Sequence, residues 1–303
     1  MRIKFQKSTF TFATVNTNLD ELTPEINELF QKNLRRDEEV QTILTAPSQR
    51  IHNREGRCKY FMPWKITPSW VLVMTNQRML IATIEFPGAV PSLKTFSFDQ
   101  ILTIELGRVL LFAWVEWDWA VDQGVDKLRI YFNAVDDTKY HKLVMAACRE
   151  RIDQFGYGKE TEKRNLDLLN DLPYKFRNII SIELLLPDEA IQSVVFRPAV
   201  HDKLMGLLRK LRAPALALIR TNYHVLTMRE DEGDAGSRYG VVFRYIPLDV
   251  IKNAEIVPGE DFLKVTTHLQ KDGSQDCVLM EFLPHQERDV RQVLAPFIDE
   301  ITR

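Results

Sequence analysis

The sequence predicts a mainly β, α+β protein made of two similar halves, each a bent antiparallel sheet followed by a C-terminal helix. Three observations support this fold class. Short segments rich in β-branched and aromatic residues are separated by turn residues, as in antiparallel sheets. The same kinds of segment recur in the same order about 150 residues later. Each half also ends in an apolar pattern with the period of a helix.

Composition narrows the class of protein. The chain has 303 residues, 45% of them hydrophobic, and a net charge of -2, which suits about two domains with real cores. So balanced a charge argues against a nucleic-acid partner. The three cysteines are scattered and indicate a reducing compartment. Because the sequence shows neither a leader peptide nor a long apolar run, we expect a cytoplasmic protein without a transmembrane segment.

Internal repetition is the strongest signal in the sequence. The matching segments are 37–47 with 188–198, 70–83 with 215–229, 95–106 with 244–256, and 127–133 with 262–268. The first pair shares two acids, an aliphatic residue, a glutamine and a final proline in the same order. Each match is weak alone, but together with the two terminal helices they keep one order. We therefore interpret the chain as a tandem duplication.

The elements of each half follow from local pattern. Two apolar runs meet at Thr75-Asn76 in the first half, and at Thr221-Asn222 in the second. Because asparagine tolerates left-handed backbone angles, both sites predict tight hairpins. The apolar spacing then predicts the closing helices over 140–155 and 287–301.

The segment between the halves predicts a helical linker. It begins with two glycines, continues as a charged stretch, and contains Pro173, which ends or bends a helix. The expected domains are therefore residues 1–155 with an N-terminal extension, a linker over 156–182, and residues 183–303.

Several motifs together resemble the bacterial pleckstrin-homology-like domains. In the first half they are Asp37-Glu38-Glu39, Thr75-Asn76-Gln77-Arg78 and Phe98-Asp99-Gln100-Ile101. The second half matches less closely, with His224 in place of the arginine and Pro247–Ile251 at the later motif. The resemblance implies two bent seven-stranded sheets, or partly open barrels, each capped by a helix and used as a scaffold for binding. It brings over no catalytic residue.

Residues 110–119, LLFAWVEWDW, contain three of the five tryptophans. Read with period two they predict a long strand with one apolar face and one face that turns acidic. One interpretation buries Trp117 and Trp119 and places Trp114 over a sheet edge or a neighbouring domain. A second makes Trp114, Trp117 and Trp119 an interface for the other half or a second chain. A platform for sugar is the third.

Motifs for catalysis and for metal binding are absent from the sequence. It contains no phosphate-binding glycine loop, no GxGxxG after a strand, no HExxH and no GxSxG. Its six histidines are scattered without metal-ligand spacing. We therefore predict a protein that is not an enzyme and uses neither a metal nor a cofactor.

Two basic clusters are the remaining candidate sites, at equivalent places in the two halves. They contain Arg50, Arg54, Arg57, Lys59 and Lys65, and Lys203, Arg209, Lys210 and Arg212. The apolar side of the second cluster predicts a short basic amphipathic helix. Solvated surfaces or internal ion pairs, an anionic lipid or phosphate ligand, and an acidic protein partner would each explain such clusters.

These observations leave three functions open. The first is a non-enzymatic binding or scaffold protein that mediates protein–protein interaction or self-association. The second is peripheral binding of anionic membrane lipid or phosphate through the two basic clusters. An enzyme with an unrecognised site is the third.

Overall fold

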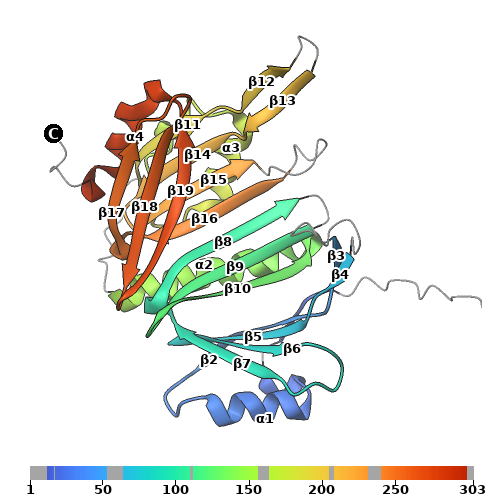
Figure 1. Ribbon diagram of the computed structural model, residues 1–303. Coiled ribbons are helices and arrows are strands. Elements are labelled where there is room, and N and C mark those ends of the chain that lie inside the picture. Colours follow the sequence, from blue (N-terminus) through green and yellow to red (C-terminus); the bar gives the residue numbers. More distant parts are fainter. Residues whose placement is uncertain are drawn as a thin grey trace, which may run out of the picture. The chain divides into compact units, whose positions relative to one another are not determined.

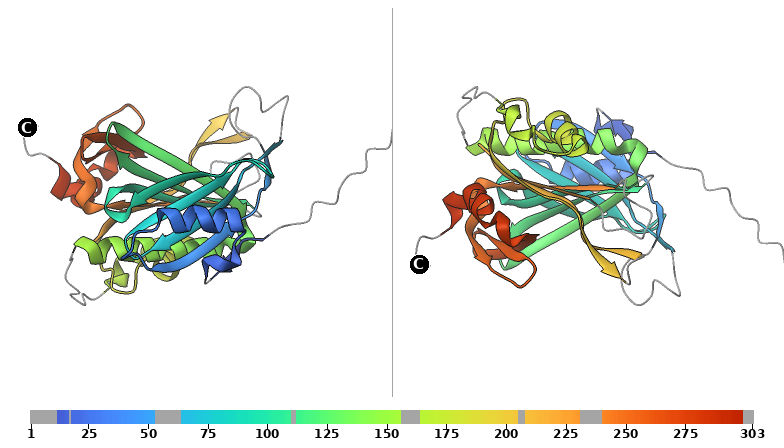
Figure 2. Two further views of the ribbon diagram at one scale, coloured as in Figure 1. Left: turned by 90° about the horizontal axis from the view of Figure 1, so that it is seen from below. Right: turned by 90° about the horizontal axis from the view of Figure 1, so that it is seen from above.

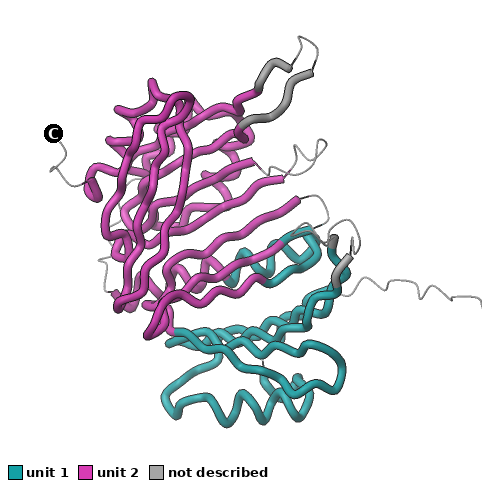
Figure 3. Tube along the Cα trace, viewed as in Figure 1, with its two compact units in different colours: residues 1–96, 111–113, 130–143 teal, residues 97–110, 114–129, 144–303 magenta. Residues whose placement is uncertain are grey.

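The chain is mainly β, as predicted, with antiparallel sheets accompanied by α-helices (Figures 1 and 2). The computed structural model describes residues 12–16, 18–52, 64–109, 112–155, 164–204, 208–230 and 240–298. Contacts divide the chain into two compact units, coloured in Figure 3. Unit 1 comprises residues 1–96, 111–113 and 130–143, and unit 2 comprises residues 97–110, 114–129 and 144–303.

Unit 1 contains a five-stranded sheet in the order β1-β2-β5-β6-β7. Its strands are β1 (Thr14–Asn16), β2 (Val40–Ala46), β5 (Ser69–Thr75), β6 (Arg78–Ile84) and β7 (Ser92–Ser97). Helix α1 (Pro24–Asn33) lies across one face of this sheet (Figures 1 and 2). Its buried Ile26 and Phe30 pack with apolar residues of β2, β5 and β6 to form the core of the unit.

Unit 2 is built on a seven-stranded sheet in the order β10-β9-β8-β16-β15-β14-β11. Its strands are β8 (Ile101–Val109), β9 (Phe112–Val121), β10 (Gly124–Asn133), β11 (Ile191–Arg197), β14 (Leu216–Thr221), β15 (His224–Glu230) and β16 (Val241–Pro247). The ends of β9 and β10 carry the residues that the contacts assign to unit 1. Most of these strands are buried on both faces, which explains their nearly continuous apolar sequences.

A second sheet of unit 2 has the order β17-β18-β19. Its strands are β17 (Ile251–Val257), β18 (Leu263–Lys271) and β19 (Ser274–Phe282). Asp272 and Gly273 both have positive φ, 46° and 82°, the geometry of the tight turn that joins β18 to β19. Helix α4 (Glu287–Leu294) packs against β11, β14 and β17 and shares one apolar core with both sheets.

The remaining elements are two hairpins, two further α-helices and several short helical segments. The hairpins are β3 (Arg50–His52) with β4 (Trp64–Ile66), and β12 (Val200–Leu204) with β13 (Leu208–Ala213). The α-helices are α2 (Asp137–Phe155) and α3 (Tyr174–Ile179). The short segments are Leu19–Glu21, Phe98–Gln100, Ala134–Asp136, Leu166–Leu169, Ile180–Leu184, Leu248–Val250, Pro284–Gln286 and Ala295–Phe297.

The two halves of the sequence have the same order of elements. From β2 to α2 the chain forms a strand, a hairpin, three strands, a short helical turn, three strands, a second turn and a helix. From β11 to α4 it repeats this series element for element. The helical turns at Phe98–Gln100 and Leu248–Val250 stand 150 residues apart, the offset seen between Asp99 and Asp249.

The compact units do not follow the boundary that the repeat predicts. Strand β8, from the first half of the sequence, pairs antiparallel with β16 from the second half. One continuous sheet therefore joins the two halves, and residues 97–110 and 114–129 belong by contact to unit 2. A boundary at residue 155 misses this junction, because strand pairing between distant segments leaves no local trace in sequence.

Candidate functional site

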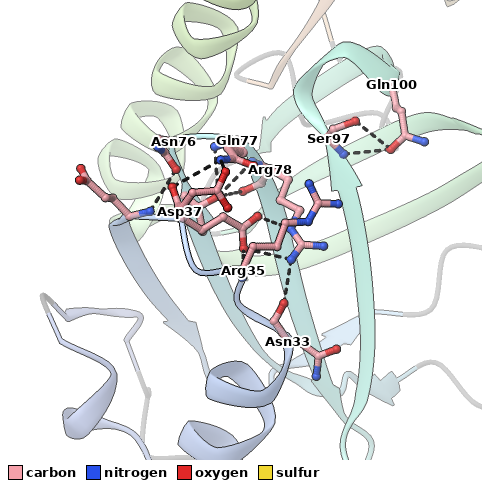
Figure 4. Close-up of polar contacts among 11 residues, drawn as sticks. Asn33, Arg35, Asp37, Asn76, Gln77, Arg78, Ser97 and Gln100 are labelled. Carbon is pink, nitrogen blue, oxygen red and sulfur yellow. Dashed lines mark hydrogen bonds and ion pairs between the residues drawn. The ribbon is translucent and has the colours of Figure 1, made fainter.

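Two of the motifs that carry the resemblance, Asp37–Glu39 and Thr75–Arg78, form a hydrogen-bonded lock at the turn between β5 and β6 of unit 1. Arg78 pairs with Glu38 at 2.5 Å (Nε to Oε1) and also donates from Nη2 to the carbonyl oxygen of Asn33 at 2.7 Å (Figure 4). The amide of Glu39 donates to Asn76 Oδ1, and the amide of Asn76 donates to the carbonyl oxygen of Glu39. These residues fix the start of β2 to the turn between β5 and β6.

Unit 2 contains a similar lock, in which a histidine takes the place of the arginine. His224 Nδ1 lies 2.9 Å from Glu189 Oε1, and Thr221 Oγ1 donates to the same oxygen at 2.5 Å. Asn222 and Ala190 exchange the same two hydrogen bonds that Asn76 and Glu39 exchange in unit 1. The acidic and Thr-Asn motifs thus hold strands together, and we place no ligand on them.

The two basic clusters both lie on hairpins, at equivalent places after β2 and β11. Residues 200–204 and 208–213 form the two strands of the β12–β13 hairpin, so the predicted amphipathic helix is wrong. Arg50 is exposed on β3, and Lys65 lies on β4. Lys203 lies on β12, while Arg209, Lys210 and Arg212 lie on β13. Arg54, Arg57 and Lys59 fall outside the described residues.

The three tryptophans are buried inside the chain. Trp114, Trp117 and Trp119 are 7%, 0% and 2% exposed on β9. None of them therefore offers a surface to a second chain or to a sugar. An interface between these tryptophans and the other half of the chain stays a prediction. The acids between them are also enclosed: Glu116 accepts from Arg129 Nε at 2.6 Å, and Asp118 accepts from Thr103 Oγ1 at 2.8 Å.

Glu105 on β8 is the centre of a charged network in unit 2. Its Oε2 accepts from Arg244 Nη2 of β16 at 2.6 Å, and its Oε1 accepts from Trp114 Nε1 of β9 at 3.1 Å. Arg129 of β10 lies 3.7 Å from Oε1 and stacks over the Trp114 ring, 5.7 Å from its centroid. We call Glu105, Trp114, Arg129 and Arg244 the Glu105 network.

The pKa values of the two buried acids of this sheet are shifted in opposite directions. Burial tends to raise the pKa of Glu105, but Arg244, the Trp114 hydrogen bond and two further arginines outweigh it and hold that pKa below its usual range. Burial also raises the pKa of Asp118, and there Lys127 and Thr103 offset it only in part. Glu105 is therefore the acid held firmly as an anion.

A cavity of about 430 Å³ opens beside the Glu105 network within unit 2. Its charged lining consists of Arg197, Arg229, Arg244, Glu105 and Glu281. Its other lining residues are Ala213, Pro214, Leu216, Thr227, Val242, Val278, Leu279 and Met280. We call this space the arginine cavity, because three guanidinium groups outnumber two carboxylates in its wall.

Strand register explains why the three arginines meet. Leu216 of β14 lies opposite both Arg197 of β11 and Arg229 of β15. Arg197 and Arg229 are thus two strand spacings apart, about 10 Å, within reach of one ligand for such long side chains. Arg244 lies two residues along β16 from Val242, the residue opposite Arg229.

Gly107 shows how closely this face is packed. A Cβ atom at Gly107 would lie 2.1 Å from Cζ2 of the Trp114 ring. Gly107→Ala should therefore displace the indole from Glu105 and lower the free energy of unfolding by about 1–3 kcal/mol, measured by urea denaturation. The same change should cost less in a Trp114→Leu background, and equal costs in both backgrounds would contradict the clash.

Within the described ranges, no group of three or more histidine, cysteine, aspartate or glutamate residues could hold a metal ion. No helix in that part of the chain is long and apolar enough to cross a membrane. Comparison with protein-family models, curated proteins and solved structures gives no match to the chain.

Proposed function

We propose that this chain is a non-enzymatic binding protein built from two pleckstrin-homology-like domains, and that the arginine cavity is its ligand site. The repeated element order and the C-terminal helix of each half support the two-domain organisation. The cavity supports a compact anionic ligand, one that carries phosphate or carboxylate groups. Guanidinium groups bind such groups through paired hydrogen bonds.

Arg229 is the observation that carries this proposal. It lines the arginine cavity, and among the described residues no hydrogen bond or ion pair engages its guanidinium group, whose charge acts on Glu105 only at longer range. The other two arginines of the cavity already make hydrogen bonds within the chain. Arg244 donates to Glu105, and Arg197 donates from Nη2 to the carbonyl oxygen of Pro214. A charged side chain half enclosed in this way is suited to an anion from outside.

The polar groups of the cavity favour binding over catalysis. A general base works best when its pKa lies near the working pH. The pKa of Glu105 is instead held below its usual range, and both of its oxygens already accept hydrogen bonds from Trp114 and Arg244. This carboxylate supports the position of the arginines rather than a proton transfer.

Inorganic phosphate and pyrophosphate are suitable probes for this site. Both should raise the melting temperature of the wild-type chain, as any ligand specific for the folded state does. Arg229→Gln should abolish the shift at a modest cost in stability, since Arg229 loses no hydrogen bond to a described residue and only its longer-range attraction to Glu105. Arg291→Gln is the matched control, because Arg291 lies on α4 and pairs there with Glu287. Equal shifts in wild type and Arg229→Gln would refute the site.

Binding to anionic membranes is the second candidate function. It is favoured by one observation, the presence of a basic hairpin at the same place in each half. Vesicles that contain phosphatidylserine should then pellet the protein at low salt and release it at high salt. Arg209→Gln with Lys210→Gln should weaken this binding, whereas Arg229→Gln should not. Failure to pellet at low salt would exclude this second function.

A further inference from the structure

The repeat contains a second pair of strands equivalent to β8 and β16, and these two strands do not pair with each other. In the repeat, β8 corresponds to β17 and β16 corresponds to β7, each pair offset by 150 residues. Yet β7 ends the five-stranded sheet and β17 ends the three-stranded sheet, so neither has a second neighbour in the described sheets. Each chain therefore carries one open edge of each kind.

Residue by residue, the two open edges are complementary. At the junction, Arg244 of β16 lies opposite Glu105 of β8. The same register would place Lys94 of β7 opposite Glu255 of β17, which again joins a cation to an anion. The pair Phe243 and Leu106 becomes Leu93 and Ile256, which again joins two apolar residues.

Residues of the open edge strand β17 are more exposed than residues of the paired strand β8. Glu105 and Leu106 are 4% and 1% exposed, whereas the side chain of Glu255 is 59% exposed and Val257 is 53% exposed. Leu93 and Ile256 are only partly buried, each at the margin of its own core. An added strand would cover these residues and would complete the backbone hydrogen bonds of both edges.

We propose that the chain self-associates head to tail, with β7 of one copy pairing antiparallel with β17 of the next in the register of β8 with β16. The contact uses different surfaces on the two partners, so it repeats from copy to copy, and it closes into a ring or continues as a filament. This inference rests on the two-domain organisation proposed above, but it does not depend on the arginine cavity.

Complementary charge reversals test the contact. Sedimentation velocity over a range of concentrations should show wild-type oligomers, and Lys94→Glu or Glu255→Lys alone should weaken association about fivefold. An equimolar mixture of the two variants should recover it, because each reversed residue then faces a reversed partner. Lys32→Glu is the control, since Lys32 is an exposed residue of α1 in the same unit as Lys94.

Three results would overturn the proposal: a wild-type chain that stays monomeric, oligomers that neither reversal weakens, or a mixture that fails to recover association. Circular dichroism of each variant confirms that a loss reflects the contact rather than unfolding. Arg229→Gln separates this proposal from the ligand site, because it should remove phosphate binding and leave the oligomer unchanged.

Discussion

Glu105→Leu is expected to lower the free energy of unfolding by about 3 kcal/mol at neutral pH. The substitution removes a carboxylate that is 4% exposed and that accepts hydrogen bonds from Arg244 and Trp114. The side chain of Arg244 is only 25% exposed, so its charge would lose its partner without gaining full hydration. Urea denaturation of the variant and the wild type measures the loss, and a change below about 1 kcal/mol would contradict it.

Glu105→Gln separates charge from shape and gives the sign of the pH dependence. The folded chain holds the pKa of Glu105 below its usual range, so its charge stabilises the fold above the pKa of the unfolded state, about 4.3. That contribution is lost as the pH falls through the folded pKa. The gap in stability between wild type and Glu105→Gln should therefore narrow on acidification below about pH 5. A gap that stays constant or widens would contradict the assignment.

Local motifs of the fold were accessible from sequence. The two Thr-Asn turns are hairpins. In each, the threonine hydroxyl accepts hydrogen bonds from the amides two and three residues later, as Thr75 does from Gln77 and Arg78. The turn and its acidic partner recur in both halves, where they make equivalent hydrogen bonds between a strand start and a hairpin turn. The lock residues themselves were visible as motifs, although their mutual contact was not.

The arginine cavity was not visible, because register rather than sequence distance gathers it. Arg197, Arg229 and Arg244 are each the one arginine or lysine of their strand, so a search for runs of basic residues passes over them. A usable signal was present all the same. A charged residue in a strand that is otherwise largely buried needs a partner or a ligand, and β11, β15 and β16 belong to one sheet, with only β14 between β15 and β11.

The tryptophan segment shows a different limit. Alternation predicted its strand, β9, but the acidic residues on one face suggested a partially solvated surface. The structure instead supplies cations from the next strand, with Arg129 on Glu116 and Lys127 on Asp118. Opposite charges across neighbouring strands allow that face to be buried. The neighbouring strands decide whether such a face is buried, and the pattern of a single strand does not say which strands are its neighbours.

Glu189→Ala is expected to have the largest effect in unit 2, about 3–5 kcal/mol. Glu189 is 0% exposed and accepts from Thr221 Oγ1, from the Leu186 amide at 3.0 Å and, with a proton on Nδ1, from His224. Its loss would take this acceptor from the Leu186 amide and the His224 ring, whereas Thr221 Oγ1 can still donate to the carbonyl oxygen of His224 at 3.1 Å. Hydrogen exchange of amides in these two strands measures the loss within unit 2 itself.

Glu38→Ala provides the matched comparison, because Glu38 takes the same place in the lock of unit 1. The side chain of Glu38 is 0% exposed, like that of Glu189, but its partner Arg78 is 13% exposed and keeps its bond to the Asn33 carbonyl oxygen, so the expected loss is smaller, about 1–2 kcal/mol. The buried lock of unit 2 instead uses histidine, whose ring can donate to a carboxylate without a net positive charge. Equal losses from the two alanine variants would show that the exposure and the remaining hydrogen bond of the partner do not set the strength of the lock.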